Sequence, residues 1–316
     1  MKKLLNQEVY QGTGKEKNYF EGWYYKNVTS DGRYVISLIP GICINESDSH
    51  AFIQIIENKN NKTYYIRYPV EEFKYDKDKL KVTIGSNVFE KDKIDLKIKE
   101  KDITLKGTLT FRNHTHLTKT AYRPNIMGPF AYLNKMECNH GIVSLHHDIN
   151  GNLKINNTRI NFNKGSGYIE KDYGSSFPKK YMWISSNSSV KKDKTSFMFS
   201  YATIPLAIIN FNGLISVLNT NDKQYVFASY YGARVKYIKR LGNKTSIEIK
   251  QNSHTLSIEC IYKEGLILAA PKSGEMAHKI NEHLDCNLKV KLYDKDNLLY
   301  ENDFIQAGYE DVGKLK

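Results

Sequence analysis

The sequence predicts an all-β protein whose antiparallel strands form a barrel or a sandwich. Most segments alternate apolar and polar residues with a period of two, as in RYVISLIPGICI (33–44), KLKVTIG (79–85) and TSIEIKQNSHTLSIECIYK (245–263). This period places the side chains of one strand on two faces. Turn signals such as Asp31-Gly32 and Asn150-Gly151 separate the segments at short intervals. Closely spaced strands without helices between them indicate antiparallel pairing.

The same pattern continues through HAFIQIIENKN (50–60), KTYYIRYPV (62–70) and KIDLKIKEKDITLKGTLTFR (93–112). The longest apolar stretch, YATIPLAIINFNGLISVL (201–218), is interrupted by Pro205, Asn210, Asn212 and Gly213. It therefore predicts two buried strands and not a membrane span.

One segment also fits a helix, namely SGEMAHKINEHLD (273–285). Met276, Ile280 and Leu284 recur every four residues, and Ser273 could cap the first turn. Met276, His278 and Ile280 equally fit an alternating strand. Both interpretations stay open.

A short internal repeat suggests two domains. YFEGWYYK begins at Tyr19 and YIEKDYG at Tyr168. Each opens with an aromatic residue, a spacer and a glutamate, and a tryptophan follows on an apolar strand, Trp23 in the first case and Trp183 in the second. The spacing, 168 − 19 = 149, is close to half of the 316 residues. We expect two tandem β domains, 1–160 and 161–316.

The charge balance limits the partners. The chain has 47 basic and 34 acidic residues, a net charge of +13, but only seven of the 47 are arginine and the lysines are scattered. This distribution argues against nucleic-acid binding and leaves a peripheral contact with an anionic membrane. The four cysteines match no zinc spacing, so we expect reduced thiols. No apolar signal region follows Met1, which predicts a cytoplasmic protein.

The stretch GYIEKDYGSSFPKKYMW (167–183) carries the main candidate site. Tyr168, Glu170 and Asp172 are two apart, so they share one face of an extended strand. Apolar burial and a neighbouring carboxylate both raise the pKa of a carboxylic acid, which could then act as a proton donor. The ordinary alternative is a solvent-exposed face, with Ile169 and Tyr173 pointing inward.

Five segments together resemble the tocopherol cyclase family: YFEGWYYK (19–26), MECNHGIVSLHHDINGNL (136–153), GYIEKDYGSSFPKKYMW (167–183), FASYYGA (227–233) and LILAAPKSGEM (266–276). The resemblance implies two tandem lipocalin-like antiparallel β-barrel domains around an apolar pocket, with chemistry on polyene or prenylated substrates. Similarity to carotenoid hydratases implies that Glu170 is the proton donor and Tyr168 the preceding aromatic. Asp172 replaces an asparagine of those hydratases, and Tyr173 a tryptophan usual in tocopherol cyclase-like proteins.

The resemblance favours an enzyme, an intramolecular lyase or isomerase. It would protonate an alkene and trap the cation with an oxygen of the substrate, using no cofactor. Its partner would be an apolar isoprenoid or quinone-like molecule. Aromatic faces steady a cation, and the candidates for this wall are Trp23, Tyr25, Tyr122 and Trp183. Glu21 shares a face with Trp23 and is a second acid of the site, a buried structural hydrogen-bonder or a residue of the rim. The alternative function is a non-catalytic lipocalin-like binding protein for an apolar ligand.

Histidines offer a rival site. Alternation puts His146 with Ser144 and Asp148, His147 on the other face, and His114 with His116 on one strand face. Histidine pairs with an aspartate can bind zinc or iron, but such pairs are common without a metal, and we expect no metal site. The chain has no GxSxG, P-loop, GxGxxG or HExxH pattern, which argues against hydrolase, kinase, dinucleotide-binding and zincin functions.

Overall fold

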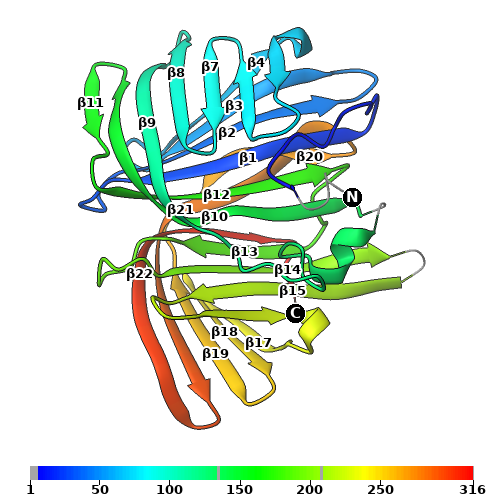
Figure 1. Cartoon of the computed structure of the whole chain (residues 1–316), viewed down its shortest axis with the longest axis vertical. Coiled ribbons are helices and arrows are strands. Elements are labelled where there is room, and N and C mark those ends of the chain that lie inside the picture. The colour runs from blue at the N-terminus through cyan, green and yellow to red at the C-terminus, as the bar shows by residue number, and fades with distance from the viewer. Residues whose placement is uncertain (1–5, 134–135, 207–208, 316) are drawn as a thin grey trace. The chain divides into compact units, whose positions relative to one another are not determined.

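A computed structural model describes residues 6–133, 136–206 and 209–315 of the chain. Nearly all of its regular secondary structure consists of antiparallel strands, as Figure 1 shows. The helical segments within these ranges are three short 3-10 turns, Val70–Glu72, Gly128–Tyr132 and Ser229–Tyr231. A helix with the length and apolar character needed to span a bilayer does not occur among the residues described. The predicted all-β class is confirmed.

The first sheet has the strand order β4-β3-β2-β1-β12-β10-β9-β8-β7-β6-β5, and β11 pairs with β10. The first and last strands of this sheet in chain order, β1 and β12, are therefore neighbours at its centre (Figure 1). Its strands are β1 (Tyr19–Val28), β2 (Val35–Ile44), β3 (His50–Glu57), β4 (Lys62–Tyr68), β5 (Phe73–Tyr75), β6 (Lys81–Ile84), β7 (Asn87–Glu90), β8 (Lys93–Lys99), β9 (Thr104–Thr115), β10 (Cys138–Ile155), β11 (Thr158–Asn161) and β12 (Gly165–Gly174).

The second sheet has the order β16-β15-β14-β13-β22-β21-β19-β18-β17, and β20 pairs with β21. Its strands are β13 (Tyr181–Ser186), β14 (Ser196–Leu206), β15 (Ile209–Asn219), β16 (Gln224–Ala228), β17 (Arg234–Leu241), β18 (Lys244–Gln251), β19 (His254–Ile261), β20 (Leu266–Lys272), β21 (Glu275–Asp294) and β22 (Asn297–Val312). The segment 273–285, which also fitted a helix, lies almost wholly in β21. Neighbouring strands satisfy its backbone, so pairing decides between the two patterns.

The described chain forms two compact units. One comprises the described residues up to Phe177 together with Leu268–Lys279, and the other Pro178–Ile267 with the described residues from Ile280. The segment containing Glu170 thus lies in the first unit. The division at residue 160 that the repeat predicts stays a prediction about folding domains.

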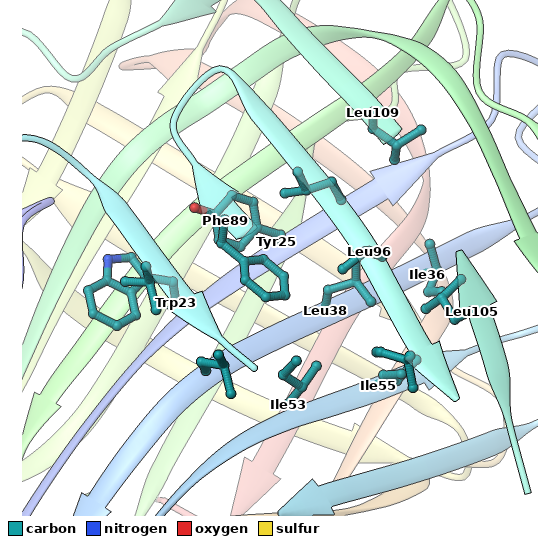
Figure 2. Packing of buried hydrophobic residues seen from close by; sticks show 14 of the residues in the cluster. Trp23, Tyr25, Ile36, Leu38, Ile53, Ile55, Phe89, Leu96, Leu105 and Leu109 are labelled. Atoms are coloured by element: carbon teal, nitrogen blue, oxygen red, sulfur yellow. The ribbon is translucent and has the colours of Figure 1, made fainter. Parts of the chain in front are cut away.

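Each unit has its own hydrophobic cluster. In the first unit, Trp23, Tyr25, Leu38, Phe89 and Leu96 are all fully buried, and Figure 2 shows their side chains pointing toward one another from β1, β2, β7 and β8. Burying large side chains of this kind is the main source of stability. We call the sheet face that packs into this cluster the inner face, and the opposite face of β1, β10 and β12 the acid face.

Candidate functional site

The acid face of β12 carries the three residues that the sequence singled out. Tyr168 is 1% exposed and Glu170 5% exposed, so the solvent-exposed alternative for these two side chains is wrong. The Tyr168 hydroxyl donates a hydrogen bond to Oε2 of Glu170 at 2.5 Å. Asp172 is partly buried on the same face. A carboxyl group removed from water and bonded to a phenol therefore lies at the centre of the first sheet.

His140 joins this group from the neighbouring strand. In the antiparallel register of β10 and β12, His140 lies directly opposite Asp172, and Ile142 opposite Glu170. Nδ1 of His140 is 2.8 Å from Oδ1 of Asp172, and Nε2 is 3.6 Å from Oε2 of Glu170. The imidazole thus uses one nitrogen toward each carboxyl group. We call Tyr168, Glu170, His140 and Asp172 the acid cluster.

The two carboxyl groups control the protonation of the histidine. Burial by itself would lower the pKa of His140, but the charges of Asp172 and Glu170 and the hydrogen bond to Asp172 outweigh it and raise the pKa to about 9. His140 is therefore protonated at neutral pH. Burial and the nearby acidic groups also raise the pKa of the Cys138 thiol well above its usual range, so this cysteine is not a thiolate nucleophile.

The acid cluster also has the donor types that a metal ion needs. His140, Glu170 and Asp172 each offer one ligand atom, and these atoms lie within 4.8 Å of one another. Among the described residues, this is the one group of three such side chains that could hold a metal ion. A ligating imidazole must be deprotonated, whereas the two carboxylates stabilise the protonated ring. Both imidazole nitrogens already face an oxygen, an arrangement that suits the storage and transfer of a proton.

Glu21 lies on the inner face, away from the acid cluster. It is fully buried, and its carboxylate accepts hydrogen bonds from the Tyr19 hydroxyl and from the backbone N–H groups of Gln11, at 2.9 Å, and Gly12, at 3.0 Å. The Lys171 ammonium forms a salt bridge with it. Every strong acceptor position of this carboxylate is used, which is the arrangement of a structural hydrogen-bonder.

Lys171 extends this inner-face network. Its ammonium donates to the carbonyl oxygens of Gln7, at 2.9 Å, and Val9, and its nitrogen is 4.8 Å from the ring centroid of Trp23. The Trp23 indole N–H donates to the carbonyl of Glu8 at 2.9 Å. The buried ion pair therefore fastens the segment 7–12 onto the end of the first sheet.

The other predicted wall residues are dispersed. Trp23 and Tyr25 belong to the inner-face cluster of Figure 2, so the sheet itself separates them from Glu170. Tyr122 is 52% exposed, in the connection between β9 and β10. Trp183 is buried on β13 in the second unit, directly opposite Glu310 of β22. Within the first unit, the structure thus brings together the three catalytic candidates but none of the wall candidates.

The histidine pattern differs from simple alternation because β10 contains two register shifts, after Ile142 and after Ser144. Ser144 consequently lies on the same face as His147. Nδ1 of His147 is 3.1 Å from the Ser144 hydroxyl. Nδ1 of His114 is 3.0 Å from the same oxygen. A β-bulge re-aims side chains in this way. The expectation that Ser144 and His147 occupy separate faces is wrong.

These histidines form a buried hydrogen-bonded group on the inner side of the sheet. Burial, with His114 and His146 nearby, holds the pKa of His147 well below its usual range. The rings of His114 and His116 are stacked, with centroids 5.8 Å apart. His114 and His147 share the Ser144 hydroxyl in a packing arrangement, which leaves the acid cluster as the candidate site.

Sequence reasoning missed three residues of the acid face. His140 lies within the segment 136–153, but its partner Asp172 is on another strand, so residue spacing alone does not indicate that the two meet. Tyr24 and the fully buried Lys26, on β1, lie opposite Glu170 and Tyr168. Their alternation with Trp23 and Tyr25 could have placed them on one face, but only strand pairing shows which residues they meet.

The fold is that of a lipocalin-like antiparallel β protein. By structure the chain is similar to CghA bound to Sch210972 (TM-score 0.60, 8% identity, 93% of this chain and 88% of that one). It is also similar to an AttH-type protein from Nitrosomonas europaea (0.52, 11%, 94% and 93%) and to kievitone hydratase from Nectria haematococca (0.52, 9%, 96% and 93%). At these identities the likeness establishes the fold.

The family follows from the sequence itself. Residues 114–313 match the tocopherol cyclase-like family, and the chain belongs to it. The matched range contains all four residues of the acid cluster. Comparison with curated protein sequences finds no match.

Proposed function

We propose that this protein is an acid-catalysed cyclase or hydratase that protonates an alkene of a prenylated or polyene substrate. The observation that supports it is the buried carboxyl of Glu170, which accepts the Tyr168 hydroxyl and faces the His140 imidazole. Protonation of carbon needs an acid stronger than an imidazolium with a pKa of about 9, so Glu170 is the donor and His140 is not.

The other members of the cluster prepare the donor. His140 and Asp172 form an ion pair whose charges cancel. When Glu170 takes up a proton, Asp172 alone holds the charge on the imidazolium, and the cluster is neutral in surroundings of low polarity. The Tyr168 hydroxyl fixes one carboxyl oxygen and so orients the Glu170 carboxyl group.

The proposed step is balanced without a cofactor. The Glu170 O–H bond breaks and a C–H bond forms at the less substituted alkene carbon, leaving a tertiary cation. A hydroxyl oxygen of the substrate, or of water, adds to that cation. The proton released by this oxygen returns to the Glu170 carboxylate, so the protein ends in its initial state.

We infer that the substrate is an apolar isoprenoid or quinone-like molecule. To identify it, the purified chain is incubated with a lipid and quinone extract of its own host, and the retained compounds are analysed by mass spectrometry. A retained polyprenyl compound supports the substrate class. Retention of polar metabolites alone would contradict it.

Turnover of the retained compound then separates an enzyme from a carrier. Glu170→Gln should bind it as the wild type does but lose activity by about a hundredfold to ten-thousandfold. Glu170→Asp, which keeps an acid one methylene shorter, should retain part of that activity. Equal binding with no turnover by the wild-type protein would establish the carrier instead, and full activity in Glu170→Gln would remove Glu170 from the mechanism.

A further inference from the structure

A basic strand lies at one end of the second sheet. β17 reads RVKYIKRL, with four basic residues and no acidic one. Arg234, Lys236 and Lys239 are exposed, whereas Arg240 is held by Asp311, with Nε and Oδ2 2.5 Å apart. Because β17 ends the strand order, its basic side chains are a feature of the edge of this sheet.

Two exposed apolar side chains continue this basic edge. β17 ends at Leu241, which is 82% exposed, and Ile261, at the end of β19, is 48% exposed. Leu241 pairs with Lys244, and Lys244 pairs with Ile261. The three residues therefore form a row across three strands, in which the stem of a lysine lies between two apolar side chains. Large exposed apolar groups of this kind mark contact surfaces.

The row is held rigidly by the adjacent turn. The backbone N–H of Tyr262 donates to the carbonyl of Asn243 at 3.0 Å, and the Tyr262 hydroxyl donates to the carbonyl of Gly242 at 3.1 Å. The Tyr262 ring stacks on Tyr309, with centroids 4.8 Å apart and planes 9° apart. Leu241 and Ile261 are thus presented at little further cost in conformational entropy.

We propose that this edge is a docking site for an anionic lipid bilayer. Leu241 and Ile261 enter the headgroup region, and Arg234, Lys236 and Lys239 bind the anionic headgroups. An amphipathic surface that combines apolar and basic side chains binds membranes through both contributions. Of the acidic residues on neighbouring strands, Glu259 pairs with Lys244 at 2.8 Å and Asp285 with Lys263 at 2.6 Å. Glu248 lies opposite Tyr237, so the three exposed basic residues of β17 still leave this edge with a net positive charge.

The same unit offers a matched control. Leu298 and Leu299 are 50% and 48% exposed and follow the turn between β21 and β22, whose sequence contains Asp294 and Asp296. This turn lies beside His254, at the other end of β19 from Ile261. Its apolar exposure is similar, but the turn carries two aspartates and only one lysine, Lys295. It therefore lacks the net positive charge of β17, and an anionic surface should bind there more weakly.

The experiment is co-sedimentation of the full chain with vesicles, independent of any turnover. We expect binding to phosphatidylcholine vesicles containing about a third phosphatidylglycerol to be at least about tenfold stronger than to pure phosphatidylcholine, and to weaken in high salt. Leu241→Ser with Ile261→Ser should lower the affinity about tenfold. Lys236→Gln with Lys239→Gln should do so by a similar factor, whereas Leu298→Ser with Leu299→Ser should change it less than twofold.

Thermal denaturation verifies that each variant is folded, as expected for exposed positions. Equal lipid binding by wild type and Leu241→Ser/Ile261→Ser would overturn the proposal. So would a dimer, measured by light scattering, that only this double variant dissociates, because the surface would then bind a second copy of the chain. Loss of lipid binding leaves the proposed chemistry at Glu170 untouched, so the two proposals fail separately.

Discussion

Two buried glutamates on opposite faces of the same pair of strands show how environment divides structural from reactive carboxyl groups. Glu21 and Glu170 each accept a tyrosine hydroxyl, from Tyr19 and Tyr168. Glu21 also has two backbone donors and the Lys171 ammonium, whereas Glu170 faces a histidine that the acid cluster keeps protonated. A saturated carboxylate has no capacity left for chemistry. The same residue type beside an imidazolium can exchange a proton.

The largest expected effect is that of replacing the structural glutamate, Glu21. Glu21→Gln leaves the Lys171 ammonium buried without its counter-charge, so the free energy of unfolding should fall by about 3 to 5 kcal/mol. Urea denaturation monitored by tryptophan fluorescence measures this loss. Glu170→Gln should cost less stability, because Asp172 still supplies a counter-charge for the His140 imidazolium.

The double variant Glu21→Gln with Lys171→Met provides the control. It removes both charges and keeps an acceptor for the backbone donors, so it should be more stable than Glu21→Gln alone. A Glu21→Gln protein as stable as the wild type would show that the two glutamates do not differ in the way described.

The same strands allow the contribution of the histidine to be measured through pH. The pKa of His140 in the folded protein, about 9, lies above its usual value of 6.5. Protonation of His140 therefore stabilises the fold fully below pH 6.5, and this contribution is lost as the pH rises through about 9. We expect the wild type to lose as much as about 3 kcal/mol over that window, and His140→Asn to lose much less.

Asp172→Asn should move the same decline to lower pH, because the amide cannot stabilise the imidazolium. NMR titration of the His140 ring measures the pKa directly in both proteins. A wild-type ring that titrates near 6.5 would contradict the account of the acid cluster.

Alanine substitutions at two glycines, one on each face, test how tightly the two faces are packed. A Cβ on Gly167, on the inner face of β12, would lie 2.1 Å from Nε2 of His147. A Cβ on Gly22, opposite Asp172 on the acid face, would meet its nearest atom at 3.6 Å, an ordinary contact. Gly167→Ala should therefore destabilise the protein by about 1 to 3 kcal/mol, and Gly22→Ala by less than about 1 kcal/mol. Thermal denaturation of the two variants would contradict this if it ranked them in the reverse order.

The smallest expected effect is that of removing metal ions. If the acid cluster works by proton transfer, dialysis against a chelator should leave turnover of the retained substrate unchanged. A loss of activity that Zn²⁺ or Fe²⁺ restores would assign His140, Glu170 and Asp172 as metal ligands instead.

Residue spacing in the sequence was sufficient to predict which side chains of the candidate site share a strand face. Tyr168, Glu170 and Asp172 share a face because alternation along an extended strand is a local property of the backbone. The same property predicted that Glu21, Trp23 and Tyr25 lie together. It did not reveal that these two groups occupy opposite faces of paired strands, since that depends on the register between β1 and β12.

The sequence by itself determined that this protein is all-β, from the period-two pattern and its turn signals, and which side chains of β12 act together. Tertiary structure decided what those side chains meet. Strand pairing brought His140 to Asp172, the register shifts of β10 turned Ser144 toward His147, and backbone bonding made a strand of the segment 273–285. The reason is physical. Alternation is fixed by each residue's own backbone geometry, whereas register, bulges and partners depend on contacts between residues far apart in the chain.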